Sequence, residues 1–153
     1  MRIAGEHVFD APREAVWEAL LDPAVLARAL PGTERLERVE EGLYRGRMKV
    51  AVGPVSAGGC DVTVRIVDPV RPESYRMEID GRGALGFARG TAAIELAEEG
   101  PGATRMRYAS DLQIGGKVAG IGQRLVDNVA KTMTARGLEA LAAEIRARVE
   151  RGA

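Results

Sequence analysis

The stretch TRMRYASDLQIGG at residues 104–116, with the chain that follows it, decides the fold. Apolar and polar residues alternate from Thr104 to Leu112, as is typical of a β-strand with one buried face and one wet face. After Gly116 the spacing of apolar residues becomes helical up to about Arg151, a length of roughly 50 Å at 1.5 Å per residue. A helix of that length can cross a whole sheet, so we predict a last strand followed by a helix packed on the sheet.

Alternation with a period of two also extends backward from this stretch to Thr33, interrupted by turns that contain Gly and Pro. Residues 3–9 alternate as well, and Pro12 and the pair Asp22-Pro23 mark the starts of two short helices. We therefore predict one α+β domain over residues 1–153, with a helix-grip layout. A curved antiparallel sheet of about seven strands wraps around the long C-terminal helix, and the two short helices follow the first strand.

The composition excludes several classes of protein. The 22 basic and 22 acidic residues balance, which argues against a nucleic-acid-binding protein. Cys60 and His7 are the only residues of their types, so one chain cannot build a zinc site from thiolates and imidazoles, and we predict no metal and no cofactor. No run of about 20 apolar residues is present. We expect a cytoplasmic protein, with transient contact to the inner face of the membrane as an open alternative.

An internal pocket is predicted because aromatic residues make up only 4% of the chain, which leaves a core of small and aliphatic groups. Strand alternation and the helical wheel direct a set of mostly apolar side chains toward one interior space, as in a site for an apolar ligand. The predicted ligand-binding residues are Trp17, Leu26, Leu30, Met48, Val50, Val64, Met77, Ile79, Phe87, Tyr108, Leu125, Val129 and Met133. We expect access at Leu30-Pro31-Gly32 and at the glycines of residues 115–122, since such segments absorb changes in dihedral angle.

Polar groups on the inward faces are few. His7, Tyr44, Tyr75 and Tyr108 can each hydrogen-bond a ligand oxygen, or can instead be satisfied within the core. Alternation places the carboxylates outward, and acid–base catalysis needs titratable groups that reach the substrate. We therefore predict no catalytic residues and a protein that is not an enzyme.

A second apolar strip on the terminal helix comprises Leu138, Ala142, Ile145 and Val149, at spacings of four, three and four. The strip is either a docking surface, for instance in a homodimer, or a surface covered by neighbouring elements of the same chain.

Several local motifs, in this order along the chain, resemble the CoxG group of carbon monoxide dehydrogenase proteins, which belongs to the START-like (SRPBCC) superfamily. They are Gly5-Glu6, APRE at residues 11–14, DPAVLARALPG at residues 22–32, VGPV at residues 52–55, and GG followed by GIG within residues 115–122.

The resemblance implies a cavity that holds a quinone or another isoprenoid lipid, and a role as carrier or accessory protein for a carbon monoxide dehydrogenase-like molybdenum hydroxylase. His7, Gly59, Asp61 and Gly137 depart from the family pattern, and most of these changes remove bulk, which suggests a reshaped pocket. Two alternatives remain open: a docking or assembly protein without a physiological ligand, and an enzyme similar to the START-like cyclases and dehydratases.

Overall fold

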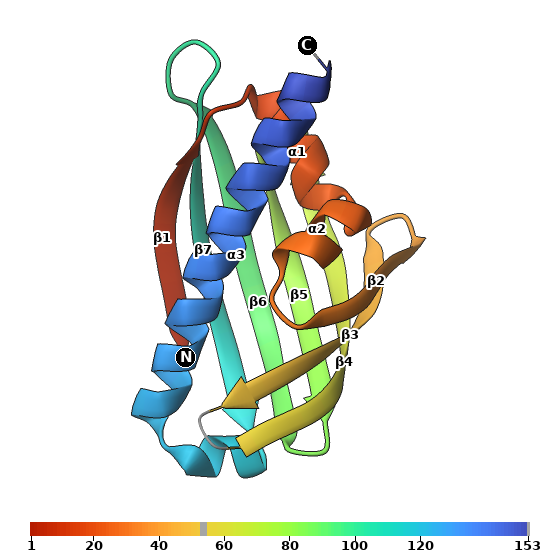
Figure 1. Cartoon of the computed structure of the whole chain (residues 1–153), viewed down its shortest axis with the longest axis vertical. Helices are drawn as coiled ribbons and strands as arrows, with labels where there is room; N and C mark the ends of the chain where they lie inside the picture. The colour runs from red at the N-terminus through yellow and green to blue at the C-terminus, as the bar shows by residue number, and fades with distance from the viewer. Residues whose placement is uncertain (53–54, 153) are drawn as a thin grey trace.

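The computed structural model confirms the predicted α+β helix-grip fold (Figure 1). It describes residues 1–52 and 55–152, without the side chains of residues 50–52 and 55–58. The elements in chain order are β1 (Arg2–Phe9), α1 (Arg13–Leu21), α2 (Pro23–Ala29), β2 (Thr33–Glu40), β3 (Leu43–Val52), β4 (Val55–Val70), β5 (Ser74–Gly83), β6 (Gly86–Glu98), β7 (Thr104–Gly115), the 3₁₀ helix η1 (Lys117–Ile121) and α3 (Gln123–Gly152).

The seven strands form one antiparallel sheet in the order β1-β7-β6-β5-β4-β3-β2. β1 and β2 therefore lie at opposite edges, and α1 and α2 make the connection between them. Figure 1 shows α3 running along one face of the sheet with α1 and α2 beside it. The three helices together cover one face, which becomes the inner face of every strand.

The two short helices follow the predicted start signals. The Asp22 carboxylate accepts a hydrogen bond from the Ala24 N–H at 2.9 Å, and Pro23 occupies the first turn of α2. The turn after α2 needs glycine, because Gly32 has a φ of +80° and a Cβ there would lie 2.1 Å from the Lys49 carbonyl oxygen. The turn therefore lies directly against the backbone of β3.

The packed core fills one end of the space between the sheet and the helices. Its central side chains come from β1, α1, the later turns of α3 and the inner faces of β5–β7. They are Phe9, Val16, Trp17, Leu20, Tyr75, Ile94, Leu96, Met106, Leu141 and Ile145.

The apolar strip on α3 belongs to this core, so the alternative that neighbouring elements of the same chain cover it is confirmed, and the docking or homodimer alternative was wrong. Ile145 is only 1% exposed, and Leu138, Ala142 and Val149 pack against the core cluster. The reason is that α3 contacts α1, α2 and β1, so more than one stripe of its circumference is covered. Residues four apart also advance by about 40° around a helix, so the contact face changes along its 30 residues.

Thr104 provides a test of the packing between β7 and the start of α1. Its hydroxyl is fully buried and donates to the Ala11 carbonyl oxygen at 2.7 Å. Thr104→Val should lower the free energy of unfolding by about 1–3 kcal/mol, because it leaves that buried carbonyl without its partner. Urea denaturation measures the change. Thr104→Ser keeps the hydroxyl and should lose less; equal losses in both variants would contradict a role for the hydrogen bond.

Candidate ligand-binding cavity

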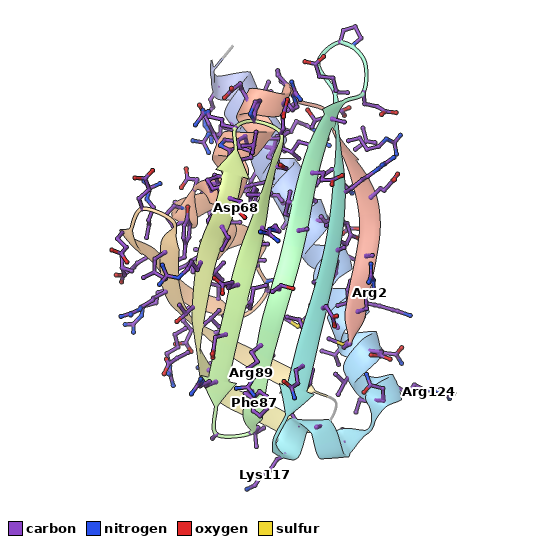
Figure 2. All side chains as sticks on the ribbon, turned by 180° about the vertical axis from the view of Figure 1, so that it is seen from behind. Arg2, Asp68, Phe87, Arg89, Lys117 and Arg124 are labelled. Carbon is purple, nitrogen blue, oxygen red and sulfur yellow. The ribbon has the colours of Figure 1, made fainter. Side chains whose placement is uncertain are left out.

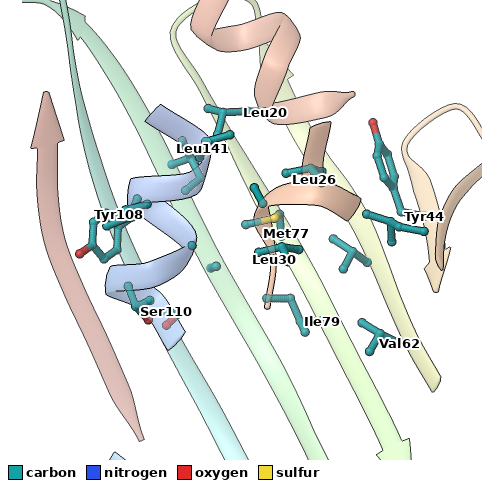
Figure 3. Close-up of a pocket in the computed structure, with 18 of the residues that line it drawn as sticks. Leu20, Leu26, Leu30, Tyr44, Val62, Met77, Ile79, Tyr108, Ser110 and Leu141 are labelled. Carbon is teal, nitrogen blue, oxygen red and sulfur yellow. The ribbon is translucent and has the colours of Figure 1, made fainter. Parts of the chain in front are cut away.

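A cavity of about 460 Å³ lies between the inner face of the sheet and helices α2 and α3 (Figure 3). This volume lies within the range of roughly 300–1,000 Å³ that is usual for small-molecule sites. Most of the side chains in its wall are aliphatic, and no described residue of the wall is charged. The cavity is therefore suited to an apolar molecule.

The structure brings most of the predicted site residues together around this cavity. They come from several strands and helices and share only their inward direction. Those that line it are Leu26, Leu30, Met48, Val64, Met77, Ile79, Tyr108 and Met133. Whether they contact a ligand stays a prediction. The side chain of Val50 and the turn Gly53-Pro54 lie outside the described residues.

Phe87 lies on the outer face of the sheet, so its predicted place in the wall was wrong. It pairs across the β5–β6 hairpin with Arg82, and directly paired residues share a face. The guanidinium of Arg89 lies over the Phe87 ring, 4.9 Å from its centroid, and Figure 2 shows both side chains on the outer side. The two-residue turn between Gly83 and Gly86 fixes this alternation, and turn length is not evident from the strand pattern alone.

Three other predicted residues also lie elsewhere. Leu125 and Val129 are in the first turns of α3, which Figure 1 shows beyond the start of β1. They do not line the cavity because α3 begins before it reaches the concave part of the sheet. Trp17 is buried in the core instead, where it packs edge-on against Tyr75 with ring centroids 5.3 Å apart. Tyr75 lines the cavity and separates it from the tryptophan.

Sequence reasoning missed other parts of the wall. Ala92 and Ile94 of β6 line the cavity on the sheet side, and Leu141 of α3 lines it on the helix side. Gly137, whose lack of bulk had suggested a reshaped pocket, also lines the cavity. The signal for β6 was the alternation of Ala92, Ile94 and Leu96 with the exposed residues Thr91 and Glu95. Small residues such as Ala92 stand out little as pocket residues because they contribute little surface of their own.

Three hydroxyl groups of the wall donate to backbone carbonyls of the protein itself. Tyr44 donates to the Leu21 carbonyl, Ser110 to the Ile3 carbonyl at 3.3 Å, and Thr134 to the Ala130 carbonyl at 2.8 Å. Burial raises the pKa of Tyr75, so its phenol stays protonated at neutral pH. The Oγ1 atom of Thr33 differs from the three donating hydroxyls, because it is buried and has no hydrogen-bond partner among the described residues.

Two further candidate residues lie apart from the cavity. His7 points inward from β1 as predicted, but it lies beside Phe9 with ring centroids 4.6 Å apart, in a separate hollow against α3. Cys60 is a free, half-buried cysteine, and burial raises the pKa of its thiol. A raised pKa leaves less of the reactive thiolate at neutral pH, which argues against a reactive cysteine.

Only the first of the two predicted access segments borders the cavity. Leu30 lines it and is 39% exposed, so it lies at the rim next to Gly137 of α3. The glycines of residues 115–122 do not line the cavity. Opening at that second segment stays a prediction.

Gly137→Ala should raise the free energy of unfolding by about 0.5–1 kcal/mol, because alanine is the better helix former. Its Cβ fits, since it would lie 3.9 Å from Leu30 Cδ2 and 4.0 Å from Pro31 Cδ. Gly122→Ala is a control of opposite sign: a φ of +113° strains any L-residue there, although the space is open. Denaturant unfolding of both variants checks the pair, and a destabilised Gly137→Ala would contradict the described fit of α3 against α2.

Comparison with known proteins gives one family and several similar folds. The family model for CoxG, described as a subunit of carbon monoxide dehydrogenase, matches residues 5–146. A conserved protein from Geobacillus kaustophilus has 28% identity and a TM-score of 0.89, over 95% of each chain. No curated protein sequence matches the chain.

Two more distant structures share the fold alone. The Zhui aromatase/cyclase from Streptomyces sp. R1128 has a TM-score of 0.74 at 19% identity, over 97% of this chain and 95% of that one. A START superfamily protein from Mycobacterium smegmatis has a TM-score of 0.69 at 12% identity, over 95% and 97% of the two chains. In the described part of the chain, no helix is long and apolar enough to cross a membrane, and no cluster of potential metal ligands is found.

Proposed function

Because this chain belongs to the CoxG family of carbon monoxide dehydrogenase proteins and has a START-like fold, we propose that it carries an apolar molecule in its cavity. The ligand class is a quinone or another isoprenoid lipid, and the partner is a carbon monoxide dehydrogenase-like molybdenum hydroxylase. The family match supports the partner, and the cavity supports the ligand class.

The observation that carries this proposal is the cavity itself. A closed protein interior is normally packed to the density of an organic crystal, with few voids larger than a water molecule. A cavity of about 460 Å³ with a mainly aliphatic wall costs stability unless something apolar fills it. An apolar ligand gains roughly 25 cal/mol for each Å² of its surface that leaves water, so the same wall provides affinity.

The proposed role is not catalytic. A cyclase or dehydratase needs an acid and a base that reach the substrate. The titratable groups among the described residues of the wall are Tyr44, Tyr75 and Tyr108, and Tyr44 already donates to a backbone carbonyl. The similarity to the Zhui aromatase/cyclase, at 19% identity, concerns the fold and does not favour the same reaction here.

Trp17 offers a direct assay for binding, because it is the only tryptophan and packs against Tyr75 of the cavity wall. Titration with a short-chain quinone should quench its fluorescence to a plateau at one ligand per protein. An isoprenoid alcohol that absorbs no light in this range should reverse the quenching by competition. Quenching that rises linearly, without saturation or competition, would contradict binding in the cavity.

The partner is tested separately with a purified carbon monoxide-oxidising hydroxylase. Oxidation of carbon monoxide with water to carbon dioxide releases two electrons and two protons, which reduce one quinone to its quinol. Quinone loaded on this protein should be reduced faster than the same amount of quinone held in detergent. Equal rates would contradict a carrier role and favour an assembly function.

A further inference from the structure

Thr33 differs from Tyr44, Ser110 and Thr134 of the cavity wall in its hydrogen bonding. Its Oγ1 atom is buried and finds no hydrogen-bond partner in the part of the chain that the structure describes, and the residue lines the cavity at the start of β2. The hydroxyls of Tyr44, Ser110 and Thr134 each donate to a backbone carbonyl. A buried hydroxyl without a partner is costly, so a bound molecule that supplies an acceptor oxygen gains from pairing with it.

The backbone around Thr33 holds this hydroxyl in place. The Thr33 N–H donates to the Leu30 carbonyl at 3.3 Å, and the Lys49 N–H donates to the Gly32 carbonyl at 2.8 Å. Thr33 also pairs with Met48 in the β2–β3 ladder. These contacts fix the turn against β3, so the orientation of Thr33 is set before any ligand binds.

Charge decides which kind of polar group fits beside Thr33. The neighbours of Thr33 and Met48 in sequence, Glu34 and Lys49, form an exposed ion pair with each other, with Lys49 Nζ 3.4 Å from a Glu34 carboxylate oxygen. Neither residue lines the cavity. A carboxylate or phosphate group within the wall would therefore lose its hydration without gaining a described cationic partner, which is strongly unfavourable.

We infer that Thr33 is the specificity-determining anchor of the cavity, and that its hydroxyl donates to a carbonyl oxygen of an electrically neutral ligand. The carbonyl end then lies at the turn between α2 and β2, and the hydrocarbon remainder lies against the strands. This inference rests on the proposed function, and it narrows the ligand to neutral carbonyl compounds such as quinones, as opposed to fatty acids or pure hydrocarbons.

The test compares Thr33→Val, which has nearly the same shape but no hydroxyl, with Thr33→Ser, which keeps the hydroxyl. Two probes are titrated by calorimetry: an alkyl-1,4-naphthoquinone and the alkylnaphthalene that lacks the two oxygens. Thr33→Val should weaken binding of the quinone about threefold to tenfold, the equivalent of one hydrogen bond. It should leave the affinity for the hydrocarbon within about twofold, and Thr33→Ser should retain quinone affinity.

Thermal unfolding without ligand gives an independent readout. Thr33→Val should melt at or above the temperature of the original protein, because it removes an unpaired buried hydroxyl. An alkanoate with the same chain length should bind at least about tenfold more weakly than the quinone, because its charge stays unpaired.

Three results would overturn the inference. They are unchanged quinone affinity in a folded Thr33→Val variant, an equal loss for both probes, and alkanoate binding as tight as quinone binding. Each of these results is compatible with ligand binding in the cavity, and contradicts only the role of Thr33 as anchor or the restriction to neutral ligands. Absence of binding of both naphthalene probes to the unmodified protein would instead contradict the proposed function.

Discussion

Replacing Ile145 with glutamate is expected to remove a large part of the protein's stability. Ile145 is 1% exposed and packs in the core that joins α3 to β1 and α1. A carboxylate placed there loses its hydration, and the isoleucine packing is lost as well, so we expect a cost of about 4–5 kcal/mol or more. Domains of this kind have only about 5–15 kcal/mol in total. Circular dichroism and urea denaturation measure the effect.

Two controls make the result specific. Arg146→Glu places the same side chain on the exposed neighbouring position and should change stability by less than about 0.5 kcal/mol. Ile145→Val should cost about 0.5–1.5 kcal/mol, as expected for removal of one buried methylene. An Ile145→Glu variant that keeps its stability and loses only self-association would contradict burial in the core and support the docking alternative.

Replacing Ala92 with phenylalanine is expected to abolish most ligand binding while leaving the protein folded. Ala92 is buried on the inner face of β6 and lines the cavity, so a benzyl group there occupies space that the ligand needs. We expect the dissociation constant of a short-chain quinone to rise at least tenfold, about 1.4 kcal/mol. The Trp17 fluorescence titration measures it.

Ala93→Phe is the matched control, because residue 93 is the next position on the same strand and its side chain points to the outer face. It should bind quinone as the unmodified protein does. Quinone affinity that is unchanged in both phenylalanine variants would mean that the ligand binds outside the cavity. An equal loss of affinity in both would mean that the substitutions disturb the strand, and that the filled space is not the cause.

The sequence predicted the fold well because the two periods that define it are long and uninterrupted. The alternation at residues 104–112 covers most of β7, and the helical spacing predicted α3, although this helix begins at Gln123, after the 3₁₀ helix η1, and not directly after Gly116. The cap at Asp22 also predicted a local hydrogen bond that the structure contains. Local signals sufficed for these features because each depends on neighbouring residues alone.

The site was predicted only in part because its boundaries depend on how the elements meet. Alternation placed Met77 and Ile79 correctly in the wall, but Phe87 follows a turn whose length sets the face on which it lies. A helical wheel grouped Leu125 with Met133, although only the middle turns of α3, from Met133 to Leu141, reach the cavity. No local pattern singles out Thr33, since its significance comes from a hydroxyl left unpaired in the folded chain.

The most direct test of the central claim is the content of the cavity in protein purified without detergent from cells that contain quinones. Extraction with organic solvent and mass spectrometry should release a neutral quinone or isoprenoid lipid, approaching one molecule per protein, and Ala92→Phe purified in parallel should release far less. Ala93→Phe should match the unmodified protein. A protein that releases no such molecule, and that also fails to take up a quinone offered in excess, would contradict the account.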